Sequence, residues 1–285
     1  MLGDITIGQM YPANSVVHRL DPRFKLVFTI MFVVMLFCAN SYLGLALNLA
    51  FVIISYLIAK IPFKMLIKTV KPIVPIVLFM MLFNIFFYQG ETVLYKLGIL
   101  SITKEGLLAA MFMVFRILLI IAGTSLLTYT TSSIELTDAI ESLLSPLKVV
   151  KFPVHELAMM MTIALRFIPT LIEETEKIMN AQKSRGADFS TGGLIKRAKA
   201  LIPILIPLFV SSFKRADELA TAMECRCYRG DKGRTKLVKL QITAIDVVML
   251  IVSLLLLGII IASLVVPPLV SIDNIIYNIA FYVIK

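Results

Sequence analysis

The chain has 285 residues, of which 59% are hydrophobic, and its mean hydropathy is +0.92. Soluble domains are roughly 45–50% apolar, so a chain this apolar lacks the polar surface that water requires, and we expect an integral membrane protein. A net charge of +10 would suit nucleic-acid binding, but the long apolar runs leave no room for a soluble basic domain, which disfavours that class.

Scanning for apolar runs predicts membrane-spanning helices, because a bilayer core of about 30 Å needs roughly 20 helical residues. Only Asn40-Ser41 separates the first two runs, which therefore form a tight hairpin or one tilted unit. Pro267 and Pro268 end the last run, and residues 271–285 are mildly amphipathic, which predicts a tail at the membrane interface. The five predicted spans are Phe24–Ala39, Tyr42–Ala59, Pro72–Tyr88, Gly106–Tyr129 and Ile242–Val266.

The distribution of Lys and Arg predicts the orientation, since cytoplasmic loops are enriched in both. Basic residues gather before the first span, in loop 60–71 and in residues 130–240, which hold seventeen. Loop 89–105 holds only Lys96 and Lys104. We therefore expect a multi-pass protein of the plasma membrane with its N-terminus and residues 130–240 in the cytoplasm. The expected domains are a four-span bundle over 1–129, a cytoplasmic part over 130–240, and a final span with an interfacial tail over 241–285.

Residues 130–240 predict three long helices. Ser132-Ser133-Ile134-Glu135 is a capping box that begins the first, and Pro146 ends it. The second runs from Pro153 to Gly186, with an expected kink at Pro169. The third follows Gly192-Gly193, contains the apolar run Leu201–Val210 and ends near Gly230. Apolar helix faces outside the bilayer must be covered either by other helices of this chain or by a second protein.

Two of these helices end alike, in Ser184-Arg185-Gly186 and in Cys225-Arg226-Cys227. Each Arg follows an Ala by four residues and has small neighbours, so its guanidinium is unobstructed and suited to bidentate binding of a carboxylate in a pocket. An Arg in a last turn also complements the helix dipole. The repetition favours a partner that has two similar sockets.

Catalytic and cofactor signatures are absent from the sequence. It contains no phosphate-binding loop, no metal-binding motif and only two His, so we expect no catalytic residue, no metal and no cofactor. The pair Cys225 and Cys227 lacks nearby partners for a metal ion. Arg116 lies inside a predicted span, where an ionisable residue is either functional or a structural or snorkelling side chain.

Two further motifs complete a pattern that resembles a known family. His18-Arg19-Leu20-Asp21-Pro22-Arg23 precedes the first span, and Arg166-Phe167-Ile168-Pro169 lies in the second long helix. Together with the two arginine ends, and in this order, they resemble the transmembrane T component of energy-coupling factor transporters, which import vitamins and trace metals. The resemblance covers about residues 10–268.

The resemblance implies an all-α membrane protein with about five transmembrane helices and three long coupling helices. Arg185 and Arg226 would each dock, with their neighbours, in a groove of one of two ATPase subunits, expected to be a heterodimer that binds the ATP. Apolar faces would hold a small substrate-binding S component amid the membrane lipid, and the chain would be no enzyme. The ATPase-docking residues would be Ser184, Arg185, Gly186, Cys225, Arg226 and Cys227; the coupling or structural candidates would be Arg166, Pro169, Arg116, Asp21 and Arg23.

One departure from the family pattern is that Cys flanks Arg226 on both sides, where Ala or Gly is more usual. Two alternatives stay open at this point: a pore-forming permease or secondary transporter, and a membrane-embedded transferase that uses Arg116. The sequence does not name the transported substrate.

Overall fold

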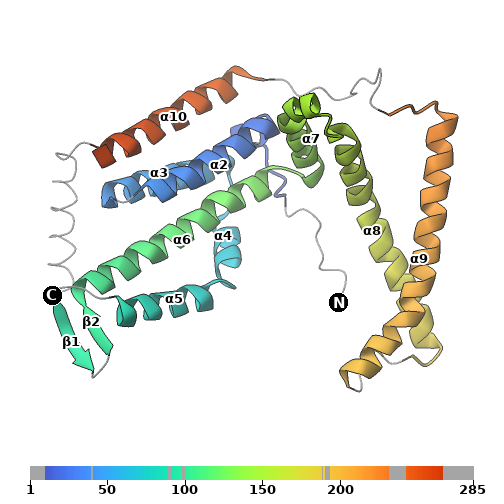
Figure 1. Ribbon diagram of the computed structural model, residues 1–285, viewed down its shortest axis with the longest axis horizontal. Coiled ribbons are helices and arrows are strands. Elements are labelled where there is room, and N and C mark those ends of the chain that lie inside the picture. Colours follow the sequence, from blue (N-terminus) through green and yellow to red (C-terminus); the bar gives the residue numbers. More distant parts are fainter. Residues whose placement is uncertain are drawn as a thin grey trace. The chain divides into compact units, whose positions relative to one another are not determined.

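A computed structural model describes residues 10–39, 41–88, 92–97, 100–187, 189, 193–230 and 242–265 (Figure 1). The described elements form two compact units. The first unit holds α1 to α6, a β-hairpin and α10, and the second holds α7, the 3-10 helix η1, α8 and α9. The bounds are α1 Val16–Arg19, α2 Pro22–Cys38, α3 Tyr42–Ala59, α4 Phe63–Val70, α5 Val74–Phe87, β1 Val93–Leu97, β2 Leu100–Thr103, α6 Lys104–Thr130, α7 Ser133–Leu144, η1 Ser145–Val150, α8 Val154–Ser184, α9 Leu194–Cys225 and α10 Ala244–Val265.

The helical fold class and the expected number of spans are confirmed, since the described residues contain four helices long and apolar enough to cross a membrane, or five if a bent pair is one span. These helices are α3, α6, α8 and α10, together with the bent pair of α4 and α5. Helix α2 is shorter, with 17 residues. Helix α8 is the least apolar of the four. The placement of α8 in the cytoplasm therefore stays a prediction.

The predicted third span, Pro72–Tyr88, is wrong in its extent. Helix α5 has only 14 residues, about 21 Å, and α4 precedes it with a bend of 61° between the two. Pro72 lies in the break and has no backbone N–H, so it cannot continue the hydrogen-bond ladder of α4. Loop 60–71 is therefore largely helical.

The predicted loop 89–105 contains a short antiparallel hairpin that the sequence reading did not anticipate. Strand β1 pairs with β2 so that Lys96 faces Ser101 and Leu97 faces Leu100. The hairpin leads directly into α6, whose first turn is capped by the Thr103 hydroxyl accepting from the Gly106 N–H at 3.2 Å.

Helix α6 is the central element of the first unit. Its first half packs against α5, where the Asn84 side-chain amide donates to the Met113 sulfur at 3.1 Å. Its second half packs against α2 and α3 (Figure 1). Gly123 permits this approach, because a Cβ at that position would lie 2.1 Å from the Phe32 ring.

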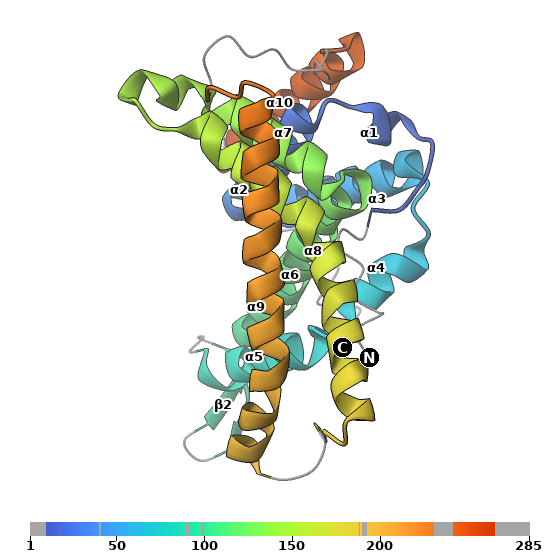
Figure 2. The same cartoon turned by 90° about the vertical axis from the view of Figure 1, so that its right-hand side faces the viewer.

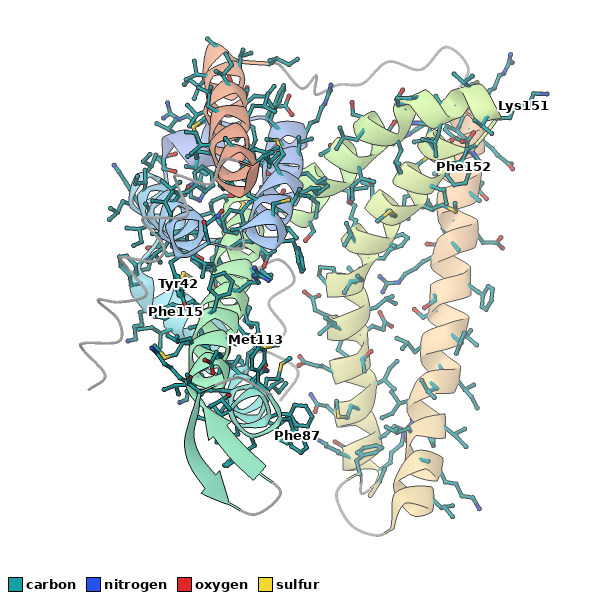
Figure 3. All side chains as sticks on the ribbon, turned by 60° about the vertical axis from the view of Figure 1, so that its left-hand side comes forward. Tyr42, Phe87, Met113, Phe115, Lys151 and Phe152 are labelled. Atoms are coloured by element: carbon teal, nitrogen blue, oxygen red, sulfur yellow. The ribbon has the colours of Figure 1, made fainter. Side chains whose placement is uncertain are left out.

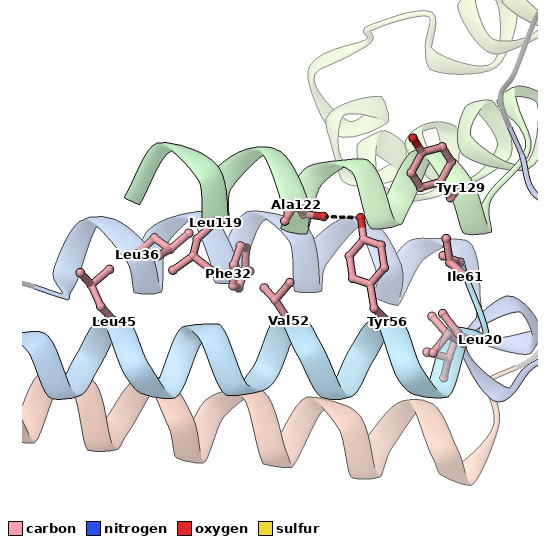
Figure 4. Close-up of a cluster of buried hydrophobic side chains, with 12 residues drawn as sticks. Leu20, Phe32, Leu36, Leu45, Val52, Tyr56, Ile61, Leu119, Ala122 and Tyr129 are labelled. Atoms are coloured by element: carbon pink, nitrogen blue, oxygen red, sulfur yellow. Dashed lines mark hydrogen bonds between the residues drawn. The ribbon is translucent and has the colours of Figure 1, made fainter. Parts of the chain in front are cut away.

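The core of this unit lies between α2, α3 and α6 (Figure 4). Tyr56 is its largest fully buried side chain, and its hydroxyl is satisfied by the Ser125 hydroxyl at 2.7 Å and the Ala122 carbonyl at 3.0 Å. Buried residues of the cluster include Leu20, Phe32, Leu36, Leu45, Val52, Ile61, Leu119 and Tyr129. Since lipid is as apolar as these side chains, close packing and satisfied polar groups hold the helices together.

The second unit is built on the antiparallel pair of α8 and α9, which lie side by side in Figures 2 and 3. Glu174 joins them, because its carboxylate accepts hydrogen bonds from the Arg215 guanidinium and, at 3.4 Å, from the Ser211 hydroxyl. Helix α7 packs on α8 through a buried His155–Glu141 contact of 3.0 Å.

The predicted bounds of these helices shift by a few residues. Helix α7 ends at Leu144, and Pro146 lies in the 3-10 turn that follows it. Pro153 is the residue before α8 rather than its first, and α9 ends at Cys225, five residues before Gly230. Four predicted features lie outside the described residues: Asn40, Gly192, Pro267 with Pro268, and the tail 271–285.

Candidate docking site

The end of α8 is a Schellman motif, in which a left-handed residue closes the helix with two backbone hydrogen bonds. Gly186 is that residue, with φ of +87°, and its N–H donates to the Lys183 carbonyl at 2.9 Å. The Ala187 N–H donates to the Gln182 carbonyl at 3.0 Å. Arg185 therefore occupies the C-cap, the last position before the chain turns away.

The end of α9 has the same construction around Arg226. The Cys227 N–H donates to the Glu224 carbonyl at 2.9 Å, and the Tyr228 N–H donates to the Met223 carbonyl at 3.0 Å. Here the left-handed residue is Cys227, with φ of 56°. A residue with a Cβ adopts this conformation at a cost that glycine avoids.

The shared alanines belong to the same geometry. The Arg185 N–H lies 3.3 Å from the Ala181 carbonyl, and the Arg226 N–H lies 3.3 Å from the Ala222 carbonyl. The repeated sequence pattern is thus a repeated structure, with an arginine at the C-cap of each helix.

Both arginine side chains are exposed. In the part of the chain that the structure describes, neither guanidinium makes a hydrogen bond or an ion pair. An exposed guanidinium beyond a helix end carries five N–H donors in a planar fork, which matches a carboxylate in two places at once.

The two ends are placed evenly about the Glu174–Arg215 contact. Arg185 lies eleven residues beyond Glu174, and Arg226 lies eleven residues beyond Arg215. At the helical rise each arginine is about 16 Å from that contact along its helix. Because α8 and α9 run in opposite directions, their C-terminal ends, which carry the arginines, lie at opposite ends of the pair, roughly 30 Å apart at the helical rise.

A stripe of exposed apolar side chains follows α9. Its members are 47–71% exposed and recur at helical spacing, so they form one face. The stripe consists of Leu201, Ile202, Leu205, Ile206, Phe209, Val210 and Phe213. Within the second unit, α8 leaves this face uncovered.

The other predicted residues of α8 do not join the helix ends. Arg166 and Pro169 are exposed on α8, more than four turns before Arg185. The helix is continuous through Pro169, and the neighbouring Thr170 hydroxyl donates to the Phe167 carbonyl at 2.8 Å.

Arg116 has a structural position. Its guanidinium donates to the Ala39 carbonyl at the end of α2, at 2.6 Å, and lies 4.9 Å from the centre of the Phe112 ring. A cation at the C-terminal end of a helix complements the helix dipole. This geometry supports the structural interpretation of Arg116.

Asp21 and Arg23 belong to a polar cluster at the beginning of α2. The Asp21 carboxylate caps α2 by accepting a hydrogen bond from the Arg23 backbone N–H at 3.0 Å. The backbone N–H of Asp21 donates to the carboxylate of fully buried Asp246, also at 3.0 Å. The buried Lys25 ammonium donates to the carbonyls of His18 and Thr130, each at 2.9 Å. These contacts hold together the ends of α1, α2, α6 and α10.

Sequence reasoning missed Asp246, although a signal was present. Thr243 and Asp246 stand three residues apart before an apolar run, as in a capping box, and the Thr243 N–H donates to the Asp246 carboxylate at 2.7 Å. In the described residues no group of three or more His, Cys, Asp and Glu side chains is arranged to hold a metal ion.

Comparison with known proteins gives a consistent result. The family model described as CbiQ, cobalt transport protein, matches residues 13–237. A protein of Ruminiclostridium cellulolyticum is 55% identical over 249 residues, which are 87% of this chain and 93% of the relative. A protein of Thermosediminibacter oceani is 52% identical, with 85% and 91% covered, and one of Bacillus subtilis is 48% identical, with 86% and 93% covered. All three are named energy-coupling factor transporter transmembrane protein EcfT.

Proposed function

Because the chain belongs to the family of energy-coupling factor transporter transmembrane proteins, we propose that Arg185 and Arg226 fasten it to two ATPase subunits. The family match confirms the resemblance seen in the sequence, and the chain is the multi-pass transmembrane component of such a transporter. The permease, secondary-transporter and transferase alternatives are set aside by this membership.

The observation that carries the docking proposal is the pair of matching helix ends. Two C-cap arginines with the same backbone geometry, at opposite ends of one helix pair, suit two sockets of similar shape. Each socket would supply a carboxylate, because the guanidinium is an obligatory cation with only donor groups. The ATPase subunits bind and hydrolyse the ATP, and this chain contributes no catalytic group.

The apolar stripe on α9 is the proposed seat of a small substrate-binding membrane protein, the S component. Its exposed side chains, from Leu201 to Phe213, need a partner that is itself apolar. A shift of α8 and α9 that follows closure of the two ATPases would then move the S component directly. The energy of hydrolysis reaches the transported vitamin or trace nutrient by this route.

The orientation is part of the proposal. The N-terminus and residues 130–240 lie in the cytoplasm of the cell, as the basic loops indicate. The exposed Cys225 and Cys227 provide a direct test in a Cys38→Ser background. A membrane-impermeant maleimide should label them in inside-out vesicles from cells that express this chain without the ATPases, and not in intact cells. Labelling of intact cells would reverse the orientation.

Docking is tested by co-purification of the two ATPases from cells that express the whole transporter. Arg185→Ala and Arg226→Ala should each weaken the attachment, and the double variant should abolish it. Loss of one member of a buried charge pair costs about 3–5 kcal/mol, or at least a hundred-fold in affinity. Lys183→Ala is the matched control, because it removes one exposed charge from the same helical turn and should retain both ATPases. Unchanged co-purification of the double variant would disprove the docking.

A further inference from the structure

Helix α4 is a short amphipathic helix with a basic edge. Lys64, Lys68 and Lys71 recur at helical spacing and are exposed, so their ammonium groups form one row. No acidic residue occurs between positions 60 and 71. The row is therefore a local concentration of positive charge without a compensating carboxylate in its own segment.

Beside this row lies an apolar groove between α3, α4 and α6. Its volume is about 510 Å³, and Lys71 is the one charged residue among the described side chains that line it. Its walls include Leu49 and Ile53 of α3 and Ile67 of α4. Phe115 of α6, which is labelled in Figure 3, also lines it. The groove is thus apolar along its length and cationic at one edge.

The groove is built by defined contacts and is not a loose gap between helices. The Tyr129 hydroxyl of α6 donates to the Met65 carbonyl of α4 at 3.2 Å and also hydrogen-bonds to the Thr69 hydroxyl. These bonds fix α4 to the end of α6. The apolar residues Phe63, Leu66, Ile67 and Val70 of α4 line the groove.

We propose that this groove binds an anionic phospholipid, with one acyl chain along α3 and α6 and the phosphate against Lys71 and its neighbours Lys64 and Lys68. An amphipathic helix with a lysine-rich edge lies at the membrane interface, where its ammonium groups reach the headgroups. Basic pockets beside membrane helices are suited to anionic headgroups. A zwitterionic lipid is disfavoured because its cationic group would meet three ammonium groups and, among the described residues that line the groove, no carboxylate.

The chain contains no Trp, so a single introduced Trp reports on the lipid beside it. Ile53→Trp places the indole in the groove, at a residue that is 40% exposed. Leu57→Trp is the matched control one turn later on α3, 60% exposed and outside the groove lining. The purified full chain is reconstituted with brominated phosphatidylglycerol or brominated phosphatidylcholine of the same acyl chains, and the fluorescence quenching is compared. Leu49→Trp replaces Ile53→Trp should that variant fail to fold.

We expect phosphatidylglycerol to quench the groove Trp preferentially and the control Trp without preference. Each lysine near a membrane surface contributes about a five-fold change in lipid binding, so Lys71→Gln should reduce the preference by about that factor. The triple Gln variant of the lysine row should abolish it, whereas Lys214→Gln on α9 should leave it unchanged.

Equal quenching of the groove Trp by both lipids would overturn the proposal. So would the same preference at Leu57→Trp, since that result reports the general attraction of a basic protein for anionic lipid. Loss of a co-purifying membrane partner from Ile53→Trp, with no lipid preference, would assign the groove to a protein segment instead.

Discussion

The closing residue of each arginine-bearing helix provides a sharp test of the proposed docking geometry. Gly186 and Cys227 hold equivalent left-handed positions, with φ of +87° and 56°. Gly186→Ala should destabilise the end of α8, because an L-residue in this conformation costs about 1–2 kcal/mol. A Cβ at Gly186 would meet no described atom within 4 Å, so the cost comes from the backbone alone. Cys227→Gly should stabilise the end of α9 by a similar amount.

These changes should alter ATPase attachment through the position of the arginines. When the cap opens, Arg185 or Arg226 leaves the position that it needs in its socket, so fewer molecules are competent to bind. A change of 1–2 kcal/mol corresponds to a factor of about 5–30. We expect Gly186→Ala to raise the dissociation constant for the ATPase pair by up to that factor and Cys227→Gly to lower it. The measurement is a titration of the purified full chain in nanodiscs with the ATPase pair.

Cys227→Ala is the control for the thiol, because it keeps the Cβ and the strained conformation. It should bind the ATPases as the unchanged chain does. The reasoning is refuted if Gly186→Ala binds with unchanged affinity, or if Cys227→Gly behaves as Cys227→Ala does.

Three further substitutions test contacts within each of the two units, and thermal unfolding in detergent is the measurement. Arg116→Ala should lower stability by about 1.5–3 kcal/mol, because it removes a charged hydrogen bond to the end of α2; a neutral effect would show that this bond contributes nothing. Glu174→Gln should cost only about 0.5–1 kcal/mol, since the Arg215 pair is about one-third exposed, and exchanging the two residues should restore the loss. Asp246→Ala should cost about 1–3 kcal/mol, because it leaves the buried N–H at the beginning of α2 without its acceptor; the same unfolding temperature as the unchanged chain would contradict this.

Local sequence signals were sufficient wherever a helix is specified by its own residues. The capping box at Ser132 and the glycine at 186 are chemical requirements of helix ends, so they placed α7 and α8 within a few residues. The repeated Ala and Arg pattern predicted two similar ends, and the structure shows them to have the same hydrogen bonds. Their binding role stays a prediction.

Local sequence signals did not predict the features of the fold that depend on contacts between residues far apart in the chain. Apolar composition alone made Pro72–Tyr88 look like a span that follows a loop, whereas Phe63–Val70 is a second helix, bent by 61° from α5 at the break that contains Pro72 and bonded to Tyr129. The contact of Arg116 with Ala39 joins residues far apart in the chain, and no local pattern reveals it. The hydrogen bond between Asp21 and Asp246 has the same character, since it connects the beginning of α2 to the beginning of α10.

The second unit combines a symmetric feature with an asymmetric one, and this combination fits the proposed partners. The two arginines stand at equal distances from the Glu174–Arg215 contact, on helices of opposite direction, which approximates a local two-fold relation. A pair of similar ATPase subunits has such a relation. The exposed apolar side chains, by contrast, are more numerous and more exposed on α9, where the stripe from Leu201 to Phe213 is 47–71% exposed, than on α8, where they are 37–53% exposed. One helix pair thus presents two equivalent attachment points and an apolar surface concentrated on α9, so closure of two like subunits would be converted into displacement of one membrane partner.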